Sequence, residues 1–199
     1  MSEEPLLPCV HLIRHGETTW SLSGLHTSRT DLPLTTQGEQ EARQLGERLR
    51  ETKFAAAITS PLIRARRTCE LAGLGSLAES DPGVQEWDYG DYEGKTSAEI
   101  WQAHTNWNLF CDGCPGGESP LQLTARVDAF ADRLRMMRGN VAVFSHGHFL
   151  RVLAARWIGM PVRVAQHLSL GTASLSILDF EHRHAENPVI ALWNELPVR

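Results

Sequence analysis

The sequence contains few cysteines, and their arrangement predicts neither a disulfide framework nor a metal site. Cys9, Cys69, Cys111 and Cys114 are spread over 199 residues, whereas small disulfide-stabilised domains carry many closely spaced cysteines. Cys111 and Cys114 form one C-x-x-C pair, but neither a second pair nor a nearby histidine completes a zinc site. We therefore expect reduced thiols, and the sequence assigns Cys111 and Cys114 no role.

Long hydrophobic runs and blocks of like charge are also absent. No apolar run approaches the ~20 residues that a membrane helix requires. Residues 1–13 begin acidic and lack the basic start and small-residue cleavage site of a secretory signal. The formal net charge of -5 disfavours a nucleic acid or an anionic membrane as a partner. These absences predict a cytoplasmic protein.

The remaining features fit one globular domain. No repeat, low-complexity tract or Gly/Ser linker marks a boundary within residues 1–199. Short apolar runs predict strands at residues 10–14, 55–60, 141–145, 173–180 and 189–193. Helices are expected to follow, with start signals of two kinds, a capping-box spacing or a serine–proline cap. These signals are Thr36 with Glu39, Thr96 with Glu99, Ser60 with Pro61, and Ser119 with Pro120.

Strands that alternate with helices imply a mostly parallel sheet covered on both faces, an α/β fold built as a three-layer α/β/α sandwich. In such sheets ligands bind beyond the carboxyl ends of the strands. Polar residues follow three of the predicted strands, namely Arg14 and His15, Ser60 and Arg64, and Ser145 and His146. We expect these three segments to converge on one rim of the sheet.

Two arginines and two histidines at that rim would suit a phosphate dianion. The guanidinium groups of Arg14 and Arg64 can pair bidentately with phosphate oxygens, and Gly16 would let a ligand approach the backbone closely. A helix that begins at Gly147 would direct backbone N–H groups toward the anion. The neutral imidazole of His15 could attack phosphorus in line, which splits hydrolysis into two easier steps.

This chemistry also needs an acid that protonates the leaving alcohol and later activates water. The segment QEWDYGDYEG, residues 85–94, offers four carboxyl groups, Glu86, Asp88, Asp91 and Glu93. Composition alone does not choose among them.

Five ordered segments resemble the motifs of the histidine phosphatase superfamily, which includes the cofactor-dependent phosphoglycerate mutases. They are LIRHGETTW (12–20), LPLTTQGEQEA (32–42), TSPLIRARRT (59–68), EWDYGDYEG (86–94) and VFSHGHFLR (143–151). A lone R-H-G would be weak support, but five motifs in the expected order cover most of residues 10–155. The resemblance implies a phosphoglycerate mutase-like fold.

Carried over by position, the resemblance makes His15 the phosphorylated nucleophile. Arg14, Arg64 and His146 become the other members of the phosphate pocket. Glu86 becomes the proton donor, which resolves the choice among the four acids.

The resemblance also bears on substrate contacts. Ser21 stands where mutases typically have a phosphate-contacting asparagine, so we expect its hydroxyl to donate one hydrogen bond. His26 and Thr27 lie in a loop that should reach the pocket. Together with Gly147, these residues form the predicted substrate-binding set.

Flanking residues are most similar to acid-phosphatase-like and sedoheptulose bisphosphatase-like members, through WSLSGLHT (20–27), EWDYGDYEG and DGCPGGES (112–119). The resemblance further implies an insertion of roughly residues 87–120 that forms a lid over the site. Mutases place cations after the acid for the substrate carboxylate, but residues 96–125 contain no lysine or arginine. This favours hydrolysis over a mutase reaction.

We therefore expect a metal-independent phosphomonoesterase that acts on small phosphorylated metabolites such as sugar phosphates, through a phosphohistidine and without a cofactor. Its partner would be a small-molecule phosphate ester, with a homodimer left open. Three alternatives remain: a mutase-type phosphoryl transferase, a non-catalytic phosphate-binding regulator, and a metallohydrolase. The last would use His11, His15, His146 and His148 as ligands. The physiological substrate, the pH optimum and the attacking nitrogen of His15 are not determined by the sequence.

Overall fold

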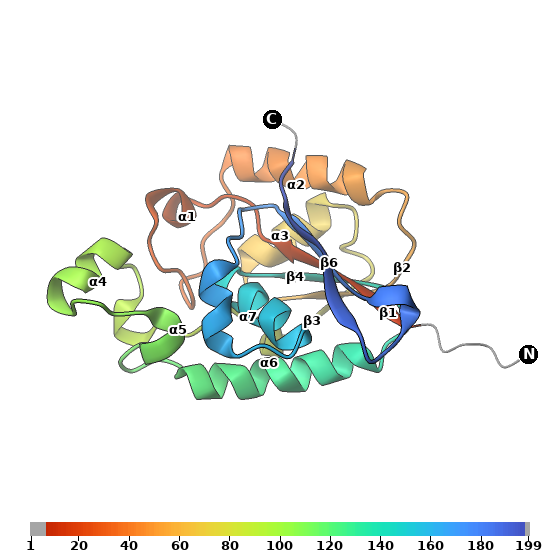
Figure 1. The fold of residues 1–199 in the computed structure, drawn as a ribbon. Coiled ribbons are helices and arrows are strands. Elements are labelled where there is room, and N and C mark those ends of the chain that lie inside the picture. The colour runs from red at the N-terminus through yellow and green to blue at the C-terminus, as the bar shows by residue number, and fades with distance from the viewer. Residues whose placement is uncertain (1–6, 198–199) are drawn as a thin grey trace, which may run out of the picture.

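The computed structural model describes residues 7–197, which form one six-stranded sheet between two layers of helices (Figure 1). The strands are β1 (Pro8–Arg14), β2 (Phe54–Thr59), β3 (Ala78–Ser80), β4 (Gly139–Ser145), β5 (Leu175–Phe180) and β6 (Pro188–Glu195). Their spatial order is β3-β2-β4-β1-β5-β6, with parallel pairing from β3 to β1 and antiparallel pairing at β5 and β6. The predicted α/β/α sandwich with a mostly parallel sheet is confirmed.

Seven α-helices are found in the described part of the chain. They are α1 (Thr19–Ser23), α2 (Thr36–Leu49), α3 (Ile63–Leu71), α4 (Ser97–Ala103), α5 (Leu109–Asp112), α6 (Pro120–Arg135) and α7 (Gly147–Trp157). Short 3₁₀ turns occur at η1 (Pro82–Val84), η2 (Gly90–Tyr92), η3 (Val162–His167) and η4 (Glu181–Arg183). No helix within residues 7–197 is long and apolar enough to cross a membrane.

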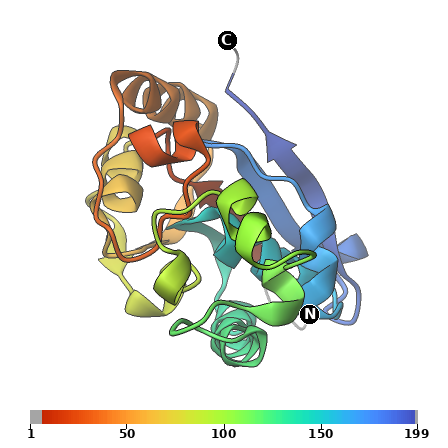
Figure 2. The same ribbon diagram turned by 90° about the vertical axis from the view of Figure 1, so that its left-hand side faces the viewer.

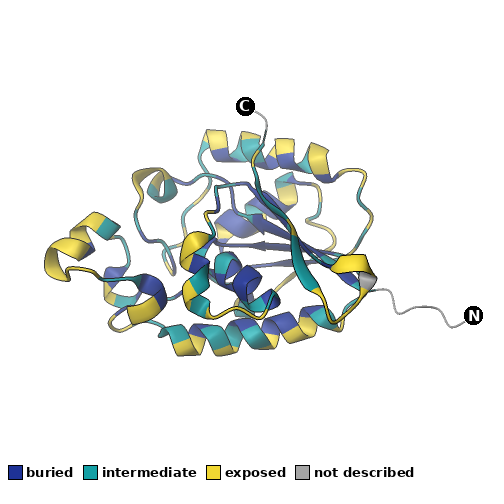
Figure 3. Cartoon of the chain, in the orientation of Figure 1, coloured by how far each residue is buried: buried dark blue, intermediate teal, exposed yellow. Residues whose placement is uncertain are grey.

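The helices cover the two faces of the sheet in pairs. On one face Ile13 of β1 packs in a cluster with Leu45 of α2, and on the other Leu12 packs with Val127 of α6. Adjacent residues of β1 therefore face opposite layers, as the two-residue period of a strand requires. Figure 3 shows the result, a sheet buried on both sides with the exposed surface on the outer helices.

Parallel pairing aligns the carboxyl ends of the three central strands. Arg14 of β1 lies opposite Ser145 of β4, and Thr59 of β2 lies opposite Phe144. The residues that follow these strands consequently lie at one edge of the sheet, as expected from the sequence. This register therefore brings the predicted site residues of the three strands together.

Two predicted helix starts are wrong, and two are confirmed. The helix predicted to begin at Pro61 after a Ser60 cap begins instead at Ile63, after Leu62, whose side chain makes no cap. The Ile63 N–H donates to the carboxylate of Asp31 at 2.8 Å, while the Ser60 hydroxyl lies 2.8 Å from a ring nitrogen of His146. The helices beginning after Thr96, with Glu99, and after Ser119 start as predicted.

The other wrong start is that of α2. Thr36 is its first residue rather than its cap, and the Thr35 hydroxyl accepts a hydrogen bond from the Gly38 N–H at 3.0 Å. Glu39 pairs with the guanidinium groups of Arg43 and Arg67 instead of closing a capping box.

The segment predicted as an insertion, residues 87–120, contains η2, α4 and α5 and projects from one end of the sheet (Figure 1). Figure 2 looks onto that end and shows α1 and α4 flanking it. An isolated antiparallel bridge joins Leu25 to Thr96 and so ties the loop after α1 to the start of α4. The sequence analysis did not anticipate α1, β3 or α5, each of which has five residues or fewer.

Gly16 has a different role from the one expected of it. A Cβ atom on Gly16 would lie 2.5 Å from the carbonyl oxygen of Gly38, and one on Gly38 would lie 2.3 Å from the carbonyl oxygen of Glu17. The loop after β1 therefore packs directly against the first turn of α2, and both glycines are required by this backbone contact. The Gly16 N–H also donates to the Thr68 hydroxyl of α3 at 2.9 Å, which fixes the loop from a second side.

This contact predicts an unusual response to substitution. Gly38→Ala should lower the free energy of unfolding by about 1–3 kcal/mol, because the new methyl group overlaps a backbone oxygen that cannot move freely. Glycine to alanine in a helix ordinarily raises stability by roughly 0.5–1 kcal/mol. Urea unfolding measures the sign, with Gln40→Ala on the exposed face of α2 as a control. A Gly38→Ala variant more stable than wild type would contradict the assignment.

Candidate active site

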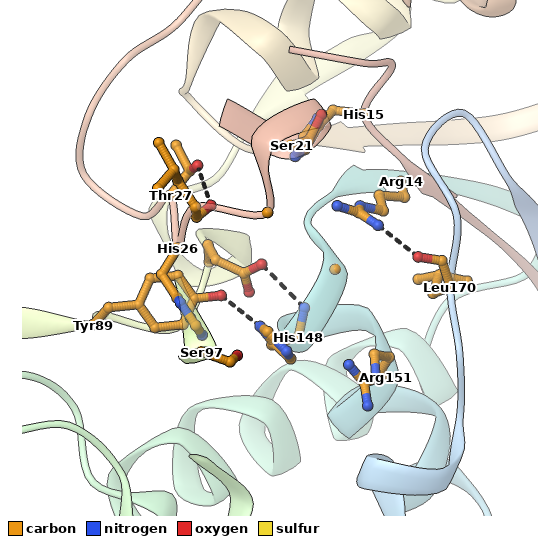
Figure 4. A pocket seen from close by; sticks show the side chains of 14 residues that line it. Arg14, His15, Ser21, His26, Thr27, Tyr89, Ser97, His148, Arg151 and Leu170 are labelled. Carbon is orange, nitrogen blue, oxygen red and sulfur yellow. Dashed lines mark hydrogen bonds between the residues drawn. The ribbon is translucent and has the colours of Figure 1, made fainter. Parts of the chain in front are cut away.

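A cavity of about 220 Å³ lies at the carboxyl ends of β1 and β4. Its wall combines the loop around α1, the segment that follows Glu86, and the first turns of α7 (Figure 4). The lining residues are Arg14, His15, Ser21, Gly24, Leu25, His26, Thr27, Glu86, Tyr89, Ser97, Gly147, His148, Arg151 and Leu170.

His15 is held in one protonation and tautomeric state. Its side chain is buried, and its Nδ1–H donates to the carbonyl oxygen of Gly16 at 2.8 Å. Because a carbonyl oxygen can only accept, the proton is on Nδ1 and Nε2 carries the free lone pair. Burial, then the positive charges of Arg64 and Arg14, hold the pKa of His15 well below its ordinary value. A neutral ring with one free nitrogen is the state that an imidazole nucleophile requires.

Arg14, the last residue of β1, presents an unsatisfied donor at the cavity. One of its terminal nitrogens, Nη1, donates to the carbonyl oxygen of Leu170 at 2.6 Å (Figure 4). Its Nε is buried and has no acceptor within residues 7–197. Burial lowers the pKa of Arg14, while the negative charge of Glu86 acts in the opposite direction.

Arg64 lies beside His15 but is fully buried and does not line the cavity. Its guanidinium donates to the carbonyl oxygens of Ser28 at 2.9 Å and Thr30 at 3.0 Å, and its Nε–H donates to Nδ1 of His146 at 3.2 Å. These bonds tie α3 to the loop of residues 27–30 and to the start of α7. The side chain was expected in the phosphate pocket, and the structure places it directly behind that pocket.

His146 is likewise buried, with its ring centroid 5.2 Å from that of His15. Since Nδ1 accepts from Arg64, the proton is on Nε2, which donates to the Ser60 hydroxyl at 2.8 Å. Burial and the charge of Arg64 hold the pKa of His146 well below its ordinary value. Both ring nitrogens are therefore occupied by protein groups, and His146 also caps α7.

Glu86 rests on the amino-terminal end of α7. Its Oε1 accepts from the backbone N–H groups of Trp87 at 2.9 Å and Phe149 at 2.8 Å, and Oε2 accepts from the N–H of His148 at 3.0 Å. These three backbone donors fix the position of the carboxyl group at the amino-terminal end of α7. Oε1 accepts two backbone hydrogen bonds and Oε2 only one, so Oε2 has the capacity to bond a ligand. Oε2 also lies next to Gly147, 3.7 Å from the position that a Cβ atom would occupy there.

The other three acids of this segment do not line the cavity. Glu93 accepts from the backbone N–H groups of Ser28 and Thr30, and so orders the same loop whose carbonyl groups Arg64 binds. Asp88 pairs with Arg29 and accepts from the Gly90 N–H. The structure thus separates Glu86 from its neighbours, as the sequence alone could not.

Two predicted substrate contacts reach the cavity with their hydroxyl hydrogens already engaged. Ser21 donates to the carbonyl oxygen of Thr18 at 3.0 Å within the capping box of α1. Thr27 donates to the carbonyl oxygen of Leu25 at 3.0 Å. In this arrangement both hydroxyl groups can only accept from a ligand, which differs from the donor role expected of Ser21.

His26 and Gly147 line the cavity, where His26 keeps one ring nitrogen for a ligand and Gly147 has no side chain to block one. The Nδ1–H of His26 donates to the carbonyl oxygen of Lys95 at 2.7 Å, so its Nε2 is an acceptor. Gly147 is the first residue of α7, and a Cβ there would lie 3.4 Å from the guanidinium of Arg14.

The cavity has further members that the sequence analysis did not place among the site residues. Tyr89 and Nδ1 of His148 form a hydrogen bond of 2.5 Å across its wall (Figure 4). Arg151 donates to the carbonyl oxygens of Ala165 and Gln166. The one sequence signal that could have placed Arg151 in the site was its position five residues after His146, on the first turns of α7.

No group of three or more His, Cys, Asp or Glu side chains within the described residues is arranged to hold a metal ion. The four histidines considered as metal ligands are not gathered. His11 faces away from the site, with its ring edge-on to that of Phe54 at 5.0 Å. Cys111 and Cys114 are unpaired, one exposed and one buried.

Comparison with known proteins identifies the family. Residues 10–195 match the model of the histidine phosphatase superfamily, branch 1. The chain is 39% identical to an acid phosphatase of Mycobacterium tuberculosis, over 91% of each protein. It is 35% identical to sedoheptulose 1,7-bisphosphatase of Saccharomyces cerevisiae, over 79% of this chain and 70% of that one.

A solved structure agrees with the family match and with these two relatives. The product of the Mycobacterium tuberculosis open reading frame Rv3214 superimposes with a TM-score of 0.90 at 34% identity, over 96% of this chain and 98% of the other. The family match spans nearly the whole described chain and includes all five motifs, so this protein belongs to the histidine phosphatase superfamily.

Proposed function

We propose that this chain is a metal-independent phosphomonoesterase that hydrolyses small phosphorylated metabolites, sugar phosphates among them, through a phosphohistidine on His15. Membership of the superfamily and the phosphatase names of its relatives support the reaction class. One observation carries the mechanism. The Nδ1–H of a buried, neutral His15 is tied to the Gly16 carbonyl, which leaves Nε2 as the attacking atom.

In the first step Nε2 of His15 attacks phosphorus, the P–N bond forms, and the P–O bond to the alcohol breaks. Arg14 lies beside it with a buried Nε–H for which residues 7–197 offer no acceptor, and a phosphate oxygen would satisfy this donor. Arg64 and His146 act from behind. The positive charge of Arg64 stabilises the added negative charge, and the His146 ring, 5.2 Å from that of His15, keeps the nucleophile in place.

The leaving alkoxide needs a proton, and we assign this proton to Glu86, which enters the reaction as the carboxylic acid. The proton is on Oε2, because Oε1 already accepts two backbone hydrogen bonds. In the second step a water molecule attacks the phosphohistidine and gives its proton back to Oε2. The P–N bond breaks and inorganic phosphate leaves. Glu86 thus acts first as acid and then as base.

The remaining contacts fit the same scheme. His26 and the amino-terminal end of α7 at Gly147 would bind the substrate, and Ser21 and Thr27 would accept hydrogen bonds from its hydroxyl groups. Residues 87–120 contribute Tyr89 and Ser97 to the cavity wall, which supports the proposal that this segment acts as a lid.

His15→Ala should abolish phosphate release, with a loss in kcat of about 10³-fold or more, because the covalent step needs the Nε2 lone pair of His15. The measurement is phosphate release with chelator present, from an aryl phosphate, phosphoglycerates, and mono- and bisphosphorylated sugars. A denaturing alkaline quench during turnover, followed by mass spectrometry, should find the phosphoryl group on the His15 peptide. Full turnover without that adduct would refute the covalent mechanism.

Glu86→Gln should lower kcat/KM for alkyl phosphates by about 10²–10⁴-fold and for an activated aryl phosphate much less, because only the alkoxide needs a proton to leave. The comparison uses kcat/KM, which reports the first chemical step. Asp88→Asn is the matched control, since Asp88 belongs to the same segment but pairs with Arg29 outside this cavity. Equal slowing of both substrate types by Glu86→Gln would exclude Glu86 as the acid.

The imidazole of His15 in the free enzyme should remain neutral as the pH falls through 6.5, the ordinary pKa of histidine. Burial and two arginines disfavour the imidazolium and lower this pKa, so the Nε2 lone pair persists in mildly acidic solution. An NMR titration of the ring, assigned with His15→Ala, would measure it. A midpoint at or above 6.5 would contradict the electrostatic account.

A further inference from the structure

A second cavity, which we call the outer groove, adjoins the active-site cavity. Its volume is about 360 Å³, and the two cavities share the side chains of His26, Ser97 and His148. A molecule bound at His15 that extends past these three residues would enter the outer groove. The groove also contains Trp101 and Trp107.

Trp101 presents a fixed ring to the groove. Its side chain is 53% exposed, and no other aromatic side chain of the described chain contacts its ring. The indole N–H donates to the backbone carbonyl of Trp107 at 2.8 Å, and the capping box of Thr96 and Glu99 fixes the start of its helix, α4. An exposed tryptophan usually costs solubility, yet this one is immobilised by a hydrogen bond and offers only its ring to a ligand.

Trp107 adds a second ring on the same wall. Its N–H donates to the carbonyl oxygen of Gly113 at 2.8 Å, and its ring packs edge-on against Tyr92 and His26, with centroids 5.2 and 5.7 Å away. Because both indole N–H groups are bonded within the protein, the two tryptophans offer aromatic surface and no donors. Such a wall binds flat, apolar rings.

Charge distinguishes the two cavities. The active-site cavity is lined by Arg14, Arg151 and Glu86, whereas no lysine, arginine, aspartate or glutamate lines the outer groove. The ionisable side chains of the groove are three histidines, His26, His148 and His167, so the groove has no permanent positive charge for an anionic group. The junction is polar, with the His26 ring and the Ser97 hydroxyl available to the hydroxyl groups of a sugar.

We infer that the preferred substrates are sugar phosphates whose sugar carries an uncharged aromatic ring, as in a nucleoside monophosphate, with the ring stacked on Trp101. The phosphate would lie at His15, the sugar between His26 and Ser97, and the ring in the outer groove. This inference deepens the proposed function and rests on it for the position of the phosphate.

The test compares two esters that differ only in the ring, adenosine 5′-monophosphate and ribose 5-phosphate. Wild type should favour the nucleoside ester in kcat/KM by about tenfold, the size expected of one base stacked on an aromatic side chain. Trp101→Ala should remove that preference, and Trp101→Phe should restore part of it. Leu121→Ala is the control, since this exposed side chain of α6 lines neither cavity and should leave the ratio unchanged.

A binding experiment separates failure of this inference from failure of the proposed function. In His15→Ala, which cannot turn over, fluorescence titration should show adenosine 5′-monophosphate binding about tenfold more tightly than ribose 5-phosphate. The Trp101→Ala substitution on that background should abolish the difference. This result would stand even if no ester were hydrolysed.

Two outcomes would overturn the inference while leaving a phosphatase in place. One is equal kcat/KM for the two esters in wild type and in Trp101→Ala. The other is a preference for a hexose bisphosphate that Trp101→Ala does not alter. That result would indicate that Arg151 binds a second phosphate at the far end of the substrate.

Discussion

The guanidinium of Arg64 has no solvent exposure and joins three segments that are far apart in the sequence. It donates to carbonyl groups of the loop at residues 27–30 and to the ring of His146, while its own backbone belongs to α3. Burying a cation without a paired carboxylate costs several kcal/mol, so the full set of hydrogen bonds is needed to hold it. Glu93 binds the N–H groups of the same loop, which fixes that loop from both sides.

The chemistry of the site follows from this buried charge. Burial, together with the nearby charges of Arg64 and Arg14, lowers the pKa of both His15 and His146, and the hydrogen bonds to Gly16 and Ser60 assign a tautomer to each ring. As the proposed nucleophile, His15 would therefore require no separate base to deprotonate it. The glycine contact between the loop after β1 and α2 holds this arrangement against the sheet.

The two sides of the active-site cavity are built from different parts of the chain. The side at His15 is built on β1, β4 and α7, which belong to the sheet or pack on it. Residues 87–120 contribute to the opposite wall, and their short helices are held by caps and by tryptophan side-chain hydrogen bonds. In the function that we propose, the first side binds the phosphate and the second selects the alcohol.

The convergence of three strand ends was predictable because it depends only on the order of strands and helices and on the parallel register. The same holds for His15, Arg14 and Glu86, which the motifs indicated and which line the cavity. Side-chain pairing was not predictable to the same degree. Ser60 carries a strong local cap signal, yet its hydroxyl bonds to His146, and Ser21 completes a capping box instead of offering a donor.

The fold class, the family and the residues at the strand ends can be inferred from the sequence, because periodicity, caps and motifs involve only a few neighbouring residues. The partner of each polar group depends on the assembled fold, since a hydroxyl or guanidinium can satisfy its hydrogen bonds locally or across the molecule. The packing of distant segments makes Gly16 a backbone contact, buries Arg64 outside the cavity lining, and brings the cavity of Arg151 next to the groove of Trp101. These are contacts between residues distant in sequence, whose geometry exists only once the sheet and helices are assembled.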